Sequence, residues 1–116
     1  MILTTEEFGD LPDVDAASLD GVFTEDAFGK FAILSASETD FIQIGNAWKP
    51  DEETRAFLQA HHSDPWVLQY REGLQLFEAS GLVTLDQARQ AFVSYLAGQS
   101  QWRNQFRWNP EERFDF

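Results

Sequence analysis

The most constraining feature of the chain is an aromatic and β-branched segment interrupted by one glycine turn. Residues 66–71 read Trp-Val-Leu-Gln-Tyr-Arg and residues 74–79 read Leu-Gln-Leu-Phe-Glu-Ala, with Glu72 and Gly73 between them. Bulky aromatic and β-branched side chains favour extended strands, and a short connection that contains glycine favours a hairpin. The segment therefore predicts two antiparallel strands, at 66–71 and 74–79.

A second pair of short apolar runs precedes this hairpin, near residues 31–36 and 40–45, with a polar connection between them. Successive side chains of a strand point to opposite faces, so Ile42 and Ile44 share one face of the second run and Gln43 lies on the other. We predict a second hairpin here.

Two helices are also expected. Pro50 and the acidic residues after it favour a helix start, and this helix should end near His61. Thr84 and Gln87 have the spacing of a capping box, and Gly98 suits the C-terminal cap of a helix over 84–97. Its apolar positions fall on one stripe: Leu85, Ala88, Phe92 and Leu96.

The resulting order, β-β-α-β-β-α, predicts an α+β fold with an antiparallel sheet of four or more strands and helices packed on one face. With 116 residues, the chain is expected to form a single domain over 1–116. Residues 31–116 would form the α+β core. Residues 1–30 contain eight acidic residues and one basic residue. We expect this part to be an acidic, loop-rich segment with one helical turn near Asp15–Leu19, packed on the domain.

Composition excludes several classes of function. Eight basic against twenty acidic residues give a net charge of −12, which disfavours direct binding of nucleic acid or of an anionic membrane surface. The absence of cysteine removes disulfides and thiolate chemistry. No apolar run is long enough to cross a membrane, and the first residues lack the basic start of a signal peptide. We therefore expect a cytoplasmic protein.

No motif of catalysis or cofactor binding is complete. His61 and His62 are adjacent, so on a helix they point about 100° apart and rarely share one metal ion. Asp40 and Glu78 are the only carboxylates placed beside apolar runs, and both positions suit a strand end or a wet face. The sequence contains neither a Gly-x-Ser-x-Gly elbow nor a glycine-rich phosphate loop. We expect no metal, no cofactor and no enzymatic activity.

The C-terminal part is rich in aromatic residues and arginines. One interpretation is that Trp102, Phe106 and Trp108 close an open edge of the core while arginines stack on them. The alternative is a surface that faces a partner, because tryptophan and arginine are favoured interface anchors. Phe114 and Phe116 are expected to belong to a frayed end.

Residues 40–108 resemble small bacterial immunity proteins that occur beside polymorphic toxins. Such proteins neutralise a toxin made by the same cell, and the resemblance implies the same kind of activity here. The motifs that carry it are Phe41-Ile-Gln43, Trp66–Gly73, Leu76–Ala79, Val83–Ala88, Ala91–Gly98, Trp102-Arg103 and Phe106–Trp108.

Charge and resemblance together predict binding of a basic protein partner, a toxin or effector enzyme whose active-site cleft is positive. The carboxylates expected to attract it are Asp10, Asp13, Asp15, Asp20, Glu25, Asp26, Asp51, Glu52 and Glu53. Trp48 lies in a loop where it would either anchor the partner or fold back over the sheet edge. Two alternatives stay open: a phage-type inhibitor that mimics nucleic acid, and a small-ligand-binding protein or enzyme.

Overall fold

The computed structural model describes residues 1–25, 28–47, 50–61 and 65–111 of the chain. Its strands are β1 (Ile2–Thr5), β2 (Gly9–Leu11), β3 (Phe31–Ser35), β4 (Phe41–Asn46), β5 (Trp66–Glu72), β6 (Gln75–Ala79) and β7 (Trp108–Glu111). Its helices are α1 (Ala16–Glu25), α2 (Glu52–His61), α3 (Leu85–Leu96) and α4 (Gln101–Asn104). None of these helices is long and apolar enough to span a membrane.

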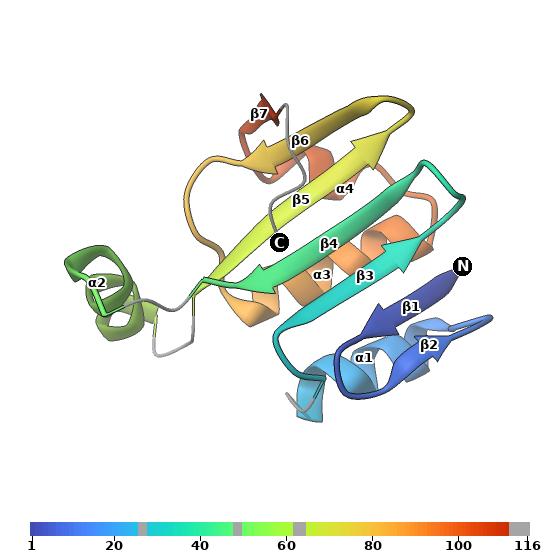
Figure 1. Cartoon of the computed structure of the whole chain (residues 1–116), viewed down its shortest axis with the longest axis horizontal. Coiled ribbons are helices and arrows are strands. Elements are labelled where there is room, and N and C mark those ends of the chain that lie inside the picture. The colour runs from blue at the N-terminus through green and yellow to red at the C-terminus, as the bar shows by residue number, and fades with distance from the viewer. Residues whose placement is uncertain (26–27, 48–49, 62–64, 112–116) are drawn as a thin grey trace.

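The strands form one antiparallel sheet in the order β2-β1-β3-β4-β5-β6-β7 (Figure 1). The α+β class with an antiparallel sheet is therefore confirmed. Both predicted hairpins form, and the sheet joins them through β4 and β5, where Ile42 lies opposite Tyr70. The turn between β5 and β6 uses Gly73 at φ +60°, a conformation that favours glycine over other residues.

The expectation that residues 1–30 are loop-rich is wrong, whereas their packing on the domain agrees with the structure. This segment is not loop-rich: it supplies two strands of the sheet and the ten-residue helix α1. Leu3 pairs with Leu34 of β3, and Leu19 and Phe23 of α1 are buried in the main core. The pairing with β3 is the physical reason, because an isolated strand of three or four residues has no stability of its own.

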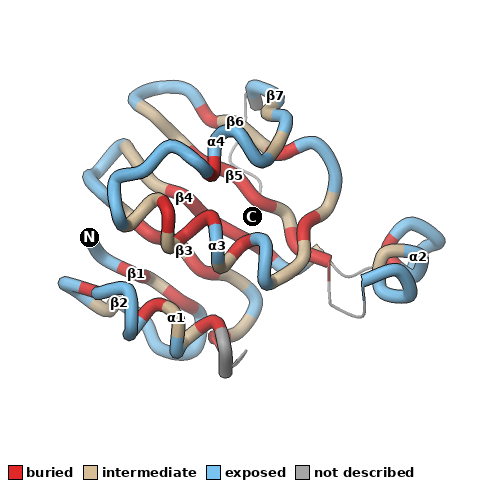
Figure 2. Tube along the Cα trace, turned by 180° about the vertical axis from the view of Figure 1, so that it is seen from behind, coloured by how far each residue is buried: buried red, intermediate tan, exposed pale blue. Residues whose placement is uncertain are grey.

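The helices do not all pack alike. Figure 2 shows α1, α3 and α4 on one face of the sheet, whereas α2 projects beyond the sheet at one end. Only Thr54 of α2 is buried. The predicted β-β-α-β-β-α order with both helices on one face is thus not confirmed, since further elements flank it and α2 does not cover the sheet.

Helix α3 is the centre of the core. Phe92 is fully buried, and its ring makes an edge-to-face contact with Phe23 of α1 at a centroid distance of 4.9 Å. Ala88 and Ala91 are fully buried as well, so the backbone of α3 can approach its neighbours closely. The contact between Phe92 and Phe23 joins the N-terminal segment to the rest of the fold.

The capping box of α3 is confirmed. The backbone N–H of Gln87 donates to the Thr84 hydroxyl at 3.0 Å, and the Gln87 amide oxygen accepts from the Thr84 backbone N–H at 2.9 Å. After the helix, Gly98 adopts φ +73°, as expected for a left-handed C-terminal cap.

Replacing Thr84 with alanine is expected to lower the free energy of unfolding by about 1 kcal/mol, because it leaves one helical N–H without its acceptor. Urea denaturation of the two proteins measures this difference. Replacement by serine, which keeps the hydroxyl, is the control and should change the stability far less. Equal losses in both variants would show that the hydroxyl does not stabilise the helix.

Candidate partner-binding site

The acidic residues of the N-terminal segment that the structure describes lie on the surface. Asp10, Asp13 and Asp15 are exposed, and Asp20 is half-buried. Asp26 and the side chain of Glu25 lie outside the described residues. The carboxylates face outward because the apolar residues between them, such as Leu19 and Phe23, take the inward positions.

Several of these carboxylates already stabilise the fold. Asp15 caps α1 by accepting the backbone N–H of Ser18 at 2.7 Å, and the hydrogen bonds from Ser18 hold the pKa of Asp15 below its usual value. Asp10 accepts the hydroxyl of Thr4 at 2.8 Å. Such hydrogen bonds fix the position of a carboxylate and leave its negative charge at the surface.

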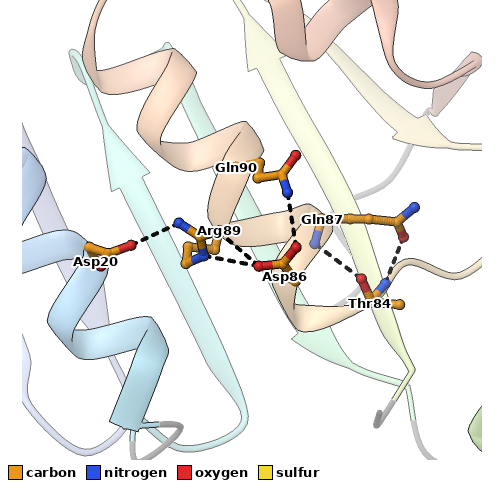
Figure 3. A network of polar contacts seen from close by, with 6 residues as sticks. All are labelled: Asp20, Thr84, Asp86, Gln87, Arg89 and Gln90. Atoms are coloured by element: carbon orange, nitrogen blue, oxygen red, sulfur yellow. Dashed lines mark hydrogen bonds and ion pairs between the residues drawn. The ribbon is translucent and has the colours of Figure 1, made fainter. Parts of the chain in front are cut away.

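Asp20 belongs to an ion-pair network between two helices (Figure 3). Arg89 of α3 contacts Asp20 of α1 at 2.8 Å and Asp86 of its own helix at 2.8 Å. Hydrogen bonds to Asp86, and then to Asp20, raise the pKa of the Arg89 guanidinium above its usual value. Arg89 is shared between two carboxylates, so the charge of Asp20 is partly offset, and Asp20 is less available to a partner than an exposed carboxylate without an ion pair.

The second acidic group stands at the start of α2. Asp51 caps this helix by accepting the backbone N–H of Thr54 at 2.9 Å and the Thr54 hydroxyl at 2.8 Å. Glu52 and Glu53 occupy the first turn and are exposed, a position that the helix dipole favours for negative charge. Trp48, the proposed anchor just before this helix, lies outside the described residues.

The structure does not bring the two acidic groups together. The N-terminal group lies around β2 and α1, at the sheet edge that β2 forms. Helix α2 projects beyond the sheet from the end where β4 finishes and β5 begins (Figure 1). In the described part of the chain, Asp13, Glu52 and Glu53 make no side-chain hydrogen bond or ion pair. They are the predicted site residues whose charges are most available to a partner.

The aromatic residues after α3 belong to the core. Trp102 is buried, and Phe106 and Trp108 pack against the core in partly buried positions. The ring of Tyr70 contacts those of Trp102 and Trp108 at 4.7 Å each. The interpretation that these aromatic residues close one edge of the core is confirmed, whereas Phe114 and Phe116 lie outside the described residues.

Arg103 stacks on this cluster, as the sequence suggested for the arginines of this region. Its guanidinium lies 5.0 Å from the Trp102 ring centroid and 5.5 Å from that of Tyr70, and it pairs with Glu72 of β5. Burial raises the pKa of Tyr70 despite the nearby positive charge of Arg103. These contacts tie α4 to the sheet.

A row of polar side chains crosses three strands on the face opposite to the helices. The amide of Gln43 donates to Gln69 at 2.8 Å, and the amide of Gln69 donates to the carboxylate of Glu78 at 2.8 Å. Gln43 and Gln69 are buried. The sequence places Gln43 on this face, but only the register of β4, β5 and β6 shows that the three side chains meet.

Asp40 and His61, which were considered for catalysis or metal binding, make local contacts within the fold. Asp40 accepts the backbone N–H of Gly73 at 2.9 Å and the hydroxyl of Thr39 at 3.0 Å, and these bonds lower its pKa. His61 is exposed at the end of α2 with its ring 4.4 Å from that of Phe57, and His62 lies outside the described residues. Within the described ranges, no group of three or more acidic or histidine side chains could hold a metal ion.

Comparison with protein-family models gives no match, and neither the curated proteins nor the solved structures contain a significant match.

Proposed function

We propose that the protein is a non-catalytic, immunity-type inhibitor that binds a basic toxin or effector enzyme and silences it. The observation that carries the proposal is the distribution of charge. A net charge of −12 on 13.3 kDa is combined with exposed carboxylates at Asp13, Glu52 and Glu53 that have no partner in the described part of the chain.

Carboxylates without internal partners favour binding over a purely structural explanation. A charge that caps a helix or pairs with an arginine stabilises the fold, as Asp15 and Asp20 do. Charges without such contacts repel one another in the isolated protein, and Glu52 and Glu53 gain only the modest stabilisation that the dipole of α2 supplies. A basic partner relieves this repulsion, and complementary charge speeds the encounter with it.

The proposal also concerns how the partner is held. Attraction between exposed charges is screened by salt and supplies little affinity by itself, so a tight inhibitor needs buried apolar anchors as well. Trp48, which precedes α2 in the sequence, is the proposed anchor, and its truncation should mainly speed dissociation.

The test is inhibition inside the cell. The candidate partner is the protein encoded by the gene next to this one, which the proposal expects to be basic; it is expressed alone and together with this chain, and growth is measured. Growth arrest that this chain relieves is the expected result. A variant with Asp13→Asn, Glu52→Gln and Glu53→Gln is expected to relieve it less at equal protein level. A neighbouring protein that stops growth equally in both cases would contradict the proposal.

A further inference from the structure

An apolar groove lies between the β1–β2 hairpin and α1. It is a shallow, open hollow with a volume of about 310 Å³. Leu11 and Val22, which line it, are partly buried and pack against the core, and Phe8 in the hairpin is 43% exposed. The residues that line the groove are Phe8, Leu11, Ala17, Ser18, Gly21 and Val22.

Gly21 keeps this groove open. It lies in the middle of α1, where glycine destabilises a helix relative to alanine. A Cβ atom added to Gly21 would meet no heavy atom within 4 Å, and its φ is not in the left-handed region. Neither the backbone nor the packing of the described structure therefore requires glycine here, whereas a side chain at this position would project into the groove.

The surroundings of the groove are negative. The hairpin and the start of α1 carry the exposed carboxylates of Glu7, Asp10, Asp13 and Asp15. The first thirty residues contain only one basic residue, Lys30. An apolar hollow with carboxylates around it complements a segment that has both apolar side chains and lysines or arginines.

We infer that this groove seats an apolar side chain of a basic, amphipathic segment of a protein partner, with the cations of that segment against the surrounding carboxylates. The inference rests on the proposed function and goes beyond it, because it adds a docking place at α1 and the hairpin to the contacts proposed near α2. Helices that lay an apolar face into a groove are a common mode of such recognition.

The experiment titrates a synthetic peptide of leucines and lysines at helical spacing into the isotope-labelled protein and follows the amide NMR signals. The largest shifts are expected at Phe8, Gly21 and Val22. Gly21→Leu, which fills the groove, should weaken binding about tenfold or more. Gly21→Ala should weaken it less and should raise the melting temperature, since alanine favours the helix.

Two controls separate the groove from general attraction. Leu74→Ala removes a side chain that is 95% exposed in the β5–β6 turn, which three intervening strands separate from β2, and should leave binding unchanged. Shifts at Glu52 and Glu53 report attraction of the peptide to α2. Equal shifts at α2 and at the groove, or equal affinity of wild type and Gly21→Leu, would overturn the inference.

The same variants distinguish this inference from the proposed function. If the neighbouring basic protein binds wild type and Gly21→Leu equally well, the docking place is wrong and the inhibitor function stands. If the peptide binds as expected and the neighbouring protein does not bind at all, the groove is confirmed and the proposed function is wrong.

Discussion

Replacing Phe92 with alanine is expected to lower the free energy of unfolding by about 3–5 kcal/mol. Phe92 is fully buried, and its ring contacts that of Phe23, which in turn contacts Phe28 at 5.2 Å. The substitution removes the contact between α3 and α1 and leaves a cavity that rigid strands cannot fill. Because typical domains are stable by only 5–15 kcal/mol, this loss should be evident in the midpoint of urea denaturation.

Leu74→Ala is the matched control for this prediction. Leu74 is 95% exposed, so its truncation should change the stability by no more than about 0.5 kcal/mol. A loss below about 1 kcal/mol for Phe92→Ala would contradict the central place of α3 in the core.

Features that depend on neighbouring residues in the chain could be predicted from the sequence. The capping box at Thr84 and the glycine turn at Gly73 are set by local hydrogen bonds and backbone angles, and both occur as expected. The hairpins follow from the same local rules. The burial of Trp102 agrees with one of the two interpretations that the sequence left open, because aromatic side chains bury a large apolar area.

Features that depend on distant pairing could not be predicted. Strands β1 and β2 are short, and β1 gains its stability from pairing with β3, a contact between distant residues that leaves no local signal in the sequence. Helix α2 has ordinary helical signals, but nothing in them shows that it projects away from the sheet. The ion pair between Asp86 and Arg89 follows from their spacing of three residues on one helix. The ion pair between Arg89 and Asp20 joins two helices that are distant in the sequence, so no local pattern predicts it.

The candidate site likewise has some features that the local sequence predicts and others that only the assembled fold shows. Exposure of Asp13, Glu52 and Glu53 follows from composition and polarity, and the structure agrees. The separation of the two acidic groups required the fold, as did the groove beside Gly21. The reason is physical: a surface is formed by elements that meet only after the sheet has assembled.

Removing negative charge is expected to slow association with the basic partner. The triple variant Asp13→Asn, Glu52→Gln and Glu53→Gln removes three charges without shortening a side chain. At low salt it should associate roughly three- to tenfold more slowly, a part of the 10–10³-fold that electrostatic steering supplies. Its dissociation rate should change little, because these carboxylates act mainly before contact.

Asn suits position 13 because Asp13 has φ +53°, and asparagine tolerates this left-handed conformation. Unchanged melting temperature of the triple variant is the condition for interpreting its rates. Leu74→Ala, which keeps every charge, is the kinetic control and should associate as fast as wild type. A triple variant that associates at the wild-type rate would contradict attraction by these charges.

The most direct test of a charge-steered inhibitor is the association rate constant of the wild-type protein with the neighbouring basic protein at two salt concentrations. At 0.01 M salt the screening length is about 30 Å, so the two acidic groups act together, whereas at 1 M it is about 3 Å. Steering predicts an association rate that falls at least about tenfold between the two conditions while dissociation changes much less. Equally fast association at both concentrations, or no association at either, would contradict it.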